Sequence, residues 1–342
     1  MILVAVSLLL VGRPSAPPSY VCHFTEESIR IDGSIDEESW QNAPWTQLFG
    51  DIVDGSPAPL ATRAAMRWDQ SNLYIAVQLE EPHLVATLTE RDSVIYDDND
   101  FEIFIDPDGD HHNYVEIEIN ALNTVWDLLL KKPYRDGGPA LSSLALEGLQ
   151  TGVRLDGTLN IPSDQDRGWS IEIAIPWSSL APYAPTVPPR EDEVWRLNFS
   201  RVKWDYTEKA GRYQKVPGRP EHNWVWAPQG AIDMHRPERW GSLHFSRKKP
   251  GTVAPAVAPD WEIRSTLVEV YYLQRKFRDR TRRWAASLEE LGATDSIFAK
   301  VQISLTAEGY EASIEIVDPS GQQQRWIIRH DSHFSSEVTV GG

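Results

Sequence analysis

Short segments in which apolar and polar residues alternate run through the first two thirds of the chain. Turn residues separate these segments, and a helical period is rare among them. Alternation with a period of two is typical of strands that bury one face. The clearest examples are residues 64–68, 73–79, 101–106, 114–120, 169–177 and 195–202. The pattern predicts a mainly β fold, a two-sheet antiparallel β-sandwich.

Segment 114–120 shows how the two faces are expected to differ. Ile117 and Ile119 fall on one face, and Glu116 and Glu118 fall on the other. We expect the apolar face to lie in the core and the acidic face to lie in water.

The pattern changes after residue 246. Pro250, Pro255 and Pro259 indicate an extended linker over residues 247–259. Residues 261–291 then carry apolar side chains three and four positions apart, which predicts a helix that stops at Gly292.

Strands are predicted after this helix at residues 299–305, 310–317 and 325–330. Residues 260–342 are therefore expected to form a small α+β tail behind a sandwich over residues 23–246. The helix also has a basic face. Such a face is usually solvated, but it can also dock the tail on the acidic sandwich or on another protein. Its side chains are Arg275, Lys276, Arg278, Arg280, Arg282 and Arg283.

The start of the chain has the features of a leader. Residues 2–11 form an apolar run of signal-peptide length, too short for a membrane span, and small residues follow it. We therefore interpret residues 1–22 as a leader and predict export to the periplasm or the exterior. Cys22 is the single cysteine, so the chain has no intrachain disulfide.

The net charge of −17 argues against one class of partner. Nucleic-acid binding depends on Lys and Arg that neutralise phosphates, so no nucleic-acid partner is expected.

Several strand blocks, taken together, resemble a known family. In their order and spacing they resemble carbohydrate-binding module family 9 over residues 24–246. The blocks are residues 31–40, 68–75, 100–106, 168–177 and 240–243. The resemblance implies a non-catalytic sandwich that binds a saccharide or polysaccharide in a cleft at one edge, with bound calcium in some members. It also implies association with carbohydrate-degrading machinery.

The resemblance assigns roles to individual residues. Tyr96 matches a stacking aromatic, while Glu102 and Glu81 match acidic positions that bind hydroxyls. Two positions depart from the family pattern. Met234 falls where a second stacking Trp belongs, and Glu118 falls where a basic residue binds hydroxyls.

Trp residues offer replacement platforms for the missing second aromatic. Trp126, Trp224 and Trp226 are the candidates, although each one alone is more typical of core packing.

Residues 106–110 suggest a cation site. Asp106, Asp108 and Asp110 place three carboxylates at alternate positions around Gly109, and hard oxygen ligands suit a structural Ca²⁺. The alternative is a plain hairpin turn, in which Asp and Gly are favoured in any case.

Three other functions stay open at this point. Met66, Met234, His222 and His235 leave open a haem-binding electron-transfer domain of related fold. The departures at Met234 and Glu118 leave open a degenerate module with a structural or interaction role. Paired carboxylates such as Glu116 and Glu118 leave open a glycoside hydrolase, although nothing marks either as catalytic, and we expect no enzyme.

Overall fold

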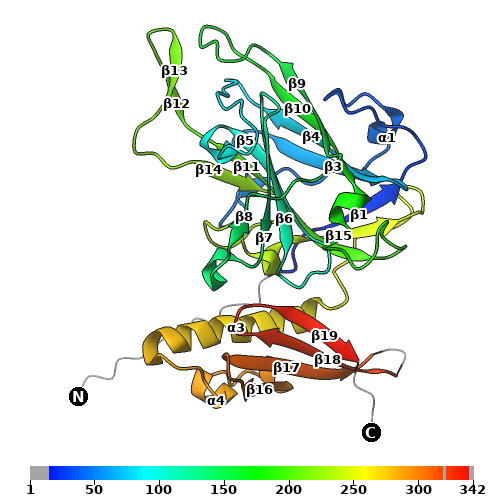
Figure 1. Ribbon diagram of the computed structural model, residues 1–342, viewed down its shortest axis with the longest axis vertical. Helices are drawn as coiled ribbons and strands as arrows, with labels where there is room; N and C mark the ends of the chain where they lie inside the picture. Colours follow the sequence, from blue (N-terminus) through cyan, green and yellow to red (C-terminus); the bar gives the residue numbers. More distant parts are fainter. Residues whose placement is uncertain (1–14, 319–320, 339–342) are drawn as a thin grey trace.

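The computed structural model describes residues 15–318 and 321–338. Figure 1 shows a large β unit above a smaller unit that packs one long helix on a sheet. The mainly β fold predicted from alternation is confirmed.

A 13-stranded sheet forms the large unit. Its strands are β1 (Ser19–Phe24), β2 (Gly50–Asp51), β3 (Thr62–Trp68), β4 (Asn72–Glu80), β5 (Asp100–Asp106), β6 (Tyr114–Asn120), β7 (Val125–Leu130), β8 (Ala140–Leu141), β9 (Gln150–Asp156), β10 (Gly168–Pro176), β11 (Val194–Lys203), β14 (His222–Val225) and β15 (Gly241–Ser246). A separate hairpin, β12 (Tyr206–Lys209) with β13 (Arg212–Lys215), and two short helices, α1 (Glu38–Gln41) and α2 (Trp177–Leu180), complete this unit.

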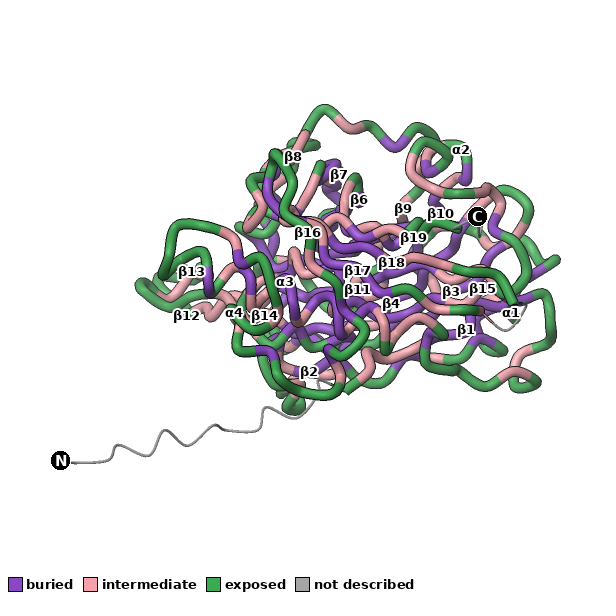
Figure 2. Tube along the Cα trace, turned by 90° about the horizontal axis from the view of Figure 1, so that it is seen from below, coloured by how far each residue is buried: buried purple, intermediate pink, exposed green. Residues whose placement is uncertain are grey.

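The sheet curls so that its two halves face each other across the main core. The strand order is β8-β7-β6-β5-β11-β15-β1-β3-β4-β10-β9, and β14 and β2 extend from β11. Strand β1 joins the halves and runs parallel to both β15 and β3. Alternate residues such as Ile103, Ile117 and Ile173 fill the space between the halves. Figure 2 shows buried residues along the strands, while the hairpin β12–β13 is largely exposed.

One predicted boundary needs correction. Residues 1–14, the larger part of the predicted leader, lie outside the described residues. Its last four residues belong to β1, where Ser19 pairs with Ser242 and Cys22 is fully buried. The boundary drawn at residue 22 is therefore too late, because the sandwich already includes Ser19.

The second unit has its own core. Its elements are α3 (Trp261–Thr281), α4 (Leu288–Leu291), β16 (Val301–Leu305), β17 (Tyr310–Val317), β18 (Gln323–Arg329) and β19 (Phe334–Val338). The helix predicted over residues 261–291 is broken, because Arg282 takes a left-handed conformation with φ 63° and ends α3. Strand β19 was not predicted. Leu267, Tyr271, Tyr310 and Ile328 are buried in a hydrophobic cluster separate from the main core.

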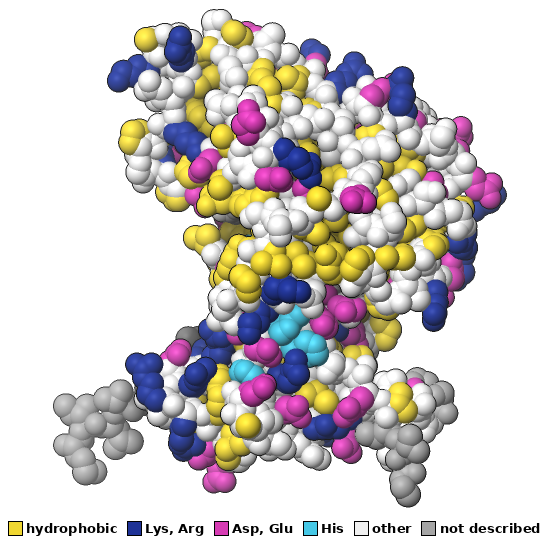
Figure 3. Space-filling view, in the orientation of Figure 1, with side chains coloured by type: hydrophobic (Ala, Val, Ile, Leu, Met, Phe, Trp, Pro, Cys, Tyr) yellow, Lys and Arg dark blue, Asp and Glu magenta, His cyan; other side chains and the backbone are white. Residues whose placement is uncertain are grey.

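The two units meet at a polar surface that we call the tail contact. Figure 3 shows His, basic and acidic side chains gathered where the upper and lower bodies join. The tail contact consists of Arg135, Asp136 and Glu238 on the sandwich and Tyr271, Tyr272 and Arg275 on α3.

Its hydrogen bonds are direct. The Tyr271 hydroxyl donates to Asp136 Oδ1 over 2.6 Å, and Arg275 Nη1 donates to the same oxygen over 2.7 Å. Arg135 Nη2 donates to Glu238 Oε2 over 2.8 Å, and the Tyr272 hydroxyl donates to Glu238 Oε1.

None of the helices among the described residues has the length and apolar character that crossing a membrane requires.

Candidate functional site

A pocket of about 460 Å³ lies on the face of β5, β6 and β7 that points away from the main core. Its volume is in the range of small-molecule sites, roughly 300–1,000 Å³. The lining residues are Ile52, Tyr96, Glu102, Phe104, Glu116, Glu118, Trp126, Leu128, Tyr134, Val202, Glu221, Asn223, Ile232, Asp233, Met234 and His235.

Strand register places the acidic side chains of the pocket side by side. Glu102 on β5 lies opposite Glu118 on β6, and Glu118 lies opposite Trp126 on β7. Alternate residues share a face, so Glu116 joins them.

This acidic face is not in water, contrary to the expectation from the sequence. Glu116 is 4% exposed and Glu118 is 2% exposed. The reason is tertiary, because residues from distant loops, among them Tyr96, Tyr134 and Met234, close over the strands.

Two exposed aromatic rings form the rim of the pocket. Tyr96 is 43% exposed and Tyr134 is 53% exposed. The Tyr96 loop is held from two sides: its amide donates to Glu118 Oε2 over 2.9 Å, and Trp204 Nε1 donates to the Tyr96 carbonyl over 2.8 Å. Trp126 is half-buried, and its buried Nε1 has no hydrogen-bond partner among the described residues.

Burial and crowding raise the pKa values of the pocket carboxylates. Burial raises the pKa of Glu102 to about 7. Burial and then the neighbouring Asp100 carboxylate raise the pKa of Glu118 well above its ordinary value, and burial and then Glu102 do the same for Glu116. None of the lining residues is Lys or Arg. Burial and then the Arg135 charge lower the pKa of His235 to about 3, so this ring is neutral at pH 7.

The structure therefore brings five of the seven predicted ligand-binding residues into one pocket. These are Tyr96, Glu102, Glu118, Trp126 and Met234. Met234 also packs against Trp240 in a small apolar cluster beside the pocket.

Glu81 and Trp226 lie outside this pocket, which corrects their expected placement. Glu81 is 1% exposed and paired with Arg201 Nη2 at 3.0 Å and Lys203 Nζ at 3.3 Å. Trp226 is 6% exposed in the main core, with its ring centroid 6.0 Å from that of Phe199. An internal ion pair and core packing account for the two residues.

Sequence reasoning missed several lining residues. Tyr134, Glu221 and Asp233 come from loops whose closure over β5–β7 depends on tertiary packing. Glu116 carried a signal, because it shares a strand face with Glu118.

The turn after β5 gathers the predicted calcium ligands. Ligand atoms of Asp106, Asp108 and Asp110 lie within 4.8 Å of one another. Both oxygens of Asp106 accept backbone amides, from Gly109 over 3.0 Å and from His111 over 2.9 Å.

The other two turn carboxylates are also engaged. Asp108 Oδ1 accepts the Asp110 amide over 3.3 Å, and Asp110 Oδ1 accepts the His112 amide over 2.6 Å. Carboxylate oxygens have further lone pairs, so the set fits part of a Ca²⁺ shell.

A larger hollow of about 720 Å³ lies over β4, β9 and β10. Its single aromatic lining residue, Trp169, is 5% exposed and offers no free ring face. Arg167 and Asp156 on its wall pair with each other. The pocket on β5–β7 is therefore the better candidate for a ligand that stacks on aromatic rings.

Comparison with known proteins gives one family. The family model described as carbohydrate family 9 binding domain-like matches residues 31–212. Among curated proteins, none matches the chain.

Two solved structures are similar to this chain, and the first of them shows a related fold. A proposed carbohydrate-binding protein from Bacteroides uniformis covers 68% of this chain and 100% of its own, with 16% identity and a TM-score of 0.51. A family 9 carbohydrate-binding module from Caldicellulosiruptor kristjanssonii, solved with cellotriose, covers 70% of this chain and 98% of its own, with 15% identity and a TM-score of 0.44. At such identity the first likeness concerns the fold.

Proposed function

Because this chain belongs to the carbohydrate family 9 binding domain-like family, we propose that it binds a saccharide without cleaving it, in the pocket on β5–β7. The observation that carries the proposal is the arrangement of two exposed rings, Tyr96 and Tyr134, at the rim above the carboxylates of Glu102 and Glu118.

The chemistry of the pocket suits a sugar. Aromatic faces bind the apolar C–H face of a sugar ring, and carboxyl groups bind its hydroxyls. Each such hydrogen bond replaces one to water and contributes about 0.5–1.5 kcal/mol. We therefore expect dissociation constants on the order of 0.1–1 mM, or about 4–5.5 kcal/mol.

Titration calorimetry tests this proposal with cellotriose, xylotriose and mannotriose. Tyr96→Ala and Glu102→Gln should each weaken binding of the preferred sugar by about tenfold, or 1.4 kcal/mol. Tyr213→Ala is the matched control, because Tyr213 lies on the hairpin β12–β13 outside the pocket. Binding that survives both pocket substitutions would place the site elsewhere.

No observation favours the other functions. Of the candidate haem ligands, Met66 lies in the main core and exposed His222 pairs with Asp205. Met234 and His235 both line the pocket, where His235 Nδ1 is hydrogen-bonded to the Tyr114 hydroxyl. Release of reducing sugar from a polysaccharide would establish a glycoside hydrolase, and intact folding without binding to any sugar would establish a degenerate module.

Calcium at the turn of Asp106, Asp108 and Asp110 belongs to this proposal as a structural ion. Support comes from the three convergent carboxylates, which would hold the ion where β5 turns into β6. The ion would add to the backbone hydrogen bonds that already shape the turn.

Export is proposed from the apolar run at residues 2–11. Sequencing the N-terminus of protein recovered from the periplasm and the medium tests it. Recovery from the cytoplasm alone, with the run intact, would contradict export.

We also propose that the chain divides into a sandwich, a linker over residues 247–259 and a tail docked through the tail contact. Support comes from the separate core of the tail and from the absence of a helix or strand in the described linker. Limited proteolysis should cut first in the linker. First cuts within the sandwich would contradict this division.

A further inference from the structure

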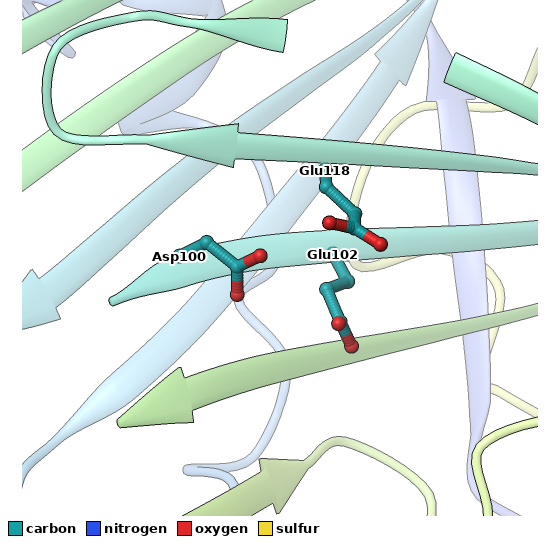
Figure 4. A group of neighbouring side chains, drawn as sticks. All are labelled: Asp100, Glu102 and Glu118. Carbon is teal, nitrogen blue, oxygen red and sulfur yellow. The ribbon is translucent and has the colours of Figure 1, made fainter. Parts of the chain in front are cut away.

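A second acidic cluster lies at the floor of the pocket, formed by Asp100, Glu102 and Glu118. Figure 4 shows the three side chains on neighbouring strands, with Asp100 and Glu102 on β5 and Glu118 on β6. Ligand oxygens of the three residues lie within 4.8 Å of one another. Two oxygens bound to one Ca²⁺ at about 2.3–2.6 Å can lie up to about 5 Å apart, so the spacing fits a shared ion.

Asp100 is the unusual member of this cluster. It is fully buried, and neither of its oxygens has a hydrogen bond of ordinary geometry to a described residue. Native proteins rarely leave a buried carboxylate in this state, because a buried charge without a partner destabilises the fold.

Among the residues that the structure describes, no positive side chain lowers the pKa of Asp100, Glu102 or Glu118. Burial and then the Glu102 charge raise the pKa of Asp100 well above its ordinary value, and the backbone of Val202 offsets this in part. The other charges that act on the cluster are carboxylates, namely Asp98, Glu116 and Glu221. A bound cation would supply the positive charge that offsets these carboxylates.

We propose that Asp100, Glu102 and Glu118 hold a divalent cation of the Ca²⁺ class at the floor of the pocket, and that saccharide hydroxyls complete its coordination. The second half of this statement rests on the proposed function. Glu102 and Glu118 line the pocket and Asp100 does not, so an ion between them is enclosed on one side and open to the ligand on the other.

The chemistry of the ligands selects the ion. Three carboxylates without His or Cys favour a hard cation, and Ca²⁺ accepts the six to eight oxygens that carboxylates and hydroxyls would provide together. An organic ammonium group is a poorer fit, since Asp100 lies behind the pocket wall.

Calcium titration of the full chain, after treatment with chelator, tests the cation site. Asp100→Asn should remove one bound equivalent, or weaken it at least tenfold. Asp108→Asn should leave that equivalent in place, because Asp108 belongs to the separate turn. Glu208→Gln, on the exposed strand β12 outside the pocket, is the matched control, and it should change the affinity less than threefold.

Tb³⁺ luminescence and the unfolding midpoint test the cation site independently of the titration. Tb³⁺ at this site should show emission sensitised by Trp126, which lies opposite Glu118, and Asp100→Asn should abolish that emission. Without calcium, Asp100→Asn should raise the unfolding midpoint, because an amide avoids the cost of desolvating or protonating a buried carboxylate. A purely structural carboxylate would give a lower midpoint. Equal calcium binding in wild type and Asp100→Asn would overturn the site.

The saccharide arm uses cellotriose, xylotriose and mannotriose, each with calcium and with chelator. Chelator should weaken the preferred sugar at least tenfold. Undiminished binding in chelator would overturn the coupling and leave the proposed function standing. Calcium binding without binding of any sugar would overturn the proposed function and the coupling, and leave the cation site standing.

Discussion

The tail contact and the floor of the pocket both bury carboxylates, but they differ in what faces those groups. Glu238 at the tail contact is 4% exposed and lies 2.8 Å from Arg135 Nη2 and 3.3 Å from Arg236 Nε. At the floor of the pocket, Glu102 and Asp100 face other carboxylates.

The pKa values of the two regions move in opposite directions. Burial alone would raise the pKa of Glu238, but Arg135 and then other positive neighbours lower it to about 2. Burial raises the pKa of Glu102 to about 7, and no positive side chain in the described part of the chain opposes this rise. The charges of neighbouring side chains thus decide whether the pKa of a buried carboxyl group falls or rises. The compensated Glu238 accepts a hydrogen bond from the Tyr272 hydroxyl of the tail, while an uncompensated carboxylate is suited to receive a ligand.

Substitution of Glu238 at the tail contact should change the free energy of unfolding more than any other substitution considered below. Glu238→Gln removes the carboxylate that pairs with both Arg135 and Arg236, and leaves Arg135 with Asp136 Oδ2 at 3.6 Å. Removing one partner of a buried pair costs about 3–5 kcal/mol. We expect that loss in the free energy of unfolding, measured with urea and Trp fluorescence. Glu290→Gln is the control, because Glu290 forms an exposed pair with Arg283 and should change little. Equal effects of the two substitutions would refute the role of the tail contact.

The same pair predicts a dependence on pH. A carboxylate with a lowered folded-state pKa contributes stability that is fully present above its unfolded value and is lost as pH falls through its folded value. For Glu238 this window runs from about 4.5 down to about 2. The stability difference between wild type and Glu238→Gln should therefore be constant from pH 8 to pH 5 and shrink below it. A difference that is unchanged at pH 3 would show that charge pairing is not its cause.

The sequence predicts the strands far better than it predicts the pocket. Alternation identifies β5, β6 and β10 and the faces that their Ile side chains bury, because a period of two is a local property of a strand. The sequence also places Tyr96, Glu102 and Glu118, although through a family resemblance and not through spacing.

What the sequence misses depends on contacts between distant segments. Glu116 and Glu118 look like a solvated face until the loops close over them. Glu81 looks like a ligand group until Arg201 and Lys203 pair with it. Both contacts join residues that are far apart in the sequence, so a local sequence pattern cannot predict them.

The turn of Asp106, Asp108 and Asp110 is intermediate between the tail contact, whose carboxylates have positive partners, and the floor of the pocket. Backbone amides already satisfy the carboxylates of this turn in part. An ion at 100 times its dissociation constant stabilises the folded state by about 2.7 kcal/mol. In an Asp100→Asn background, which leaves only the turn, calcium should still raise the unfolding midpoint. Adding Asp108→Asn should abolish the rise, and exposed Asp164→Asn should not. An unchanged midpoint in the Asp100→Asn background would remove the turn as a calcium site.

The smallest effect should come from Tyr134, a rim residue that connects the two regions. The short helical turn Tyr134–Asp136 carries Tyr134 on the rim of the pocket and Arg135 and Asp136 in the tail contact. An aromatic contact contributes about 0.5–1.5 kcal/mol beyond area burial, so Tyr134→Ala should weaken saccharide binding by about threefold to tenfold. Tyr134→Phe keeps the ring and should bind as wild type does.

This pair of variants separates stacking from an indirect effect through the tail. If the ring acts by stacking, Tyr134→Ala lowers affinity in calorimetry while the rate of proteolysis in the linker stays at the wild-type value. The Tyr134 ring also contacts His235, with centroids 4.5 Å apart, so its loss can loosen the loop that leads to Glu238. In that case faster cleavage of the linker would accompany the weaker binding, and Glu238→Gln would weaken saccharide binding as well. The pocket and the tail contact would then act as one coupled region, because the turn that joins them would transmit the change.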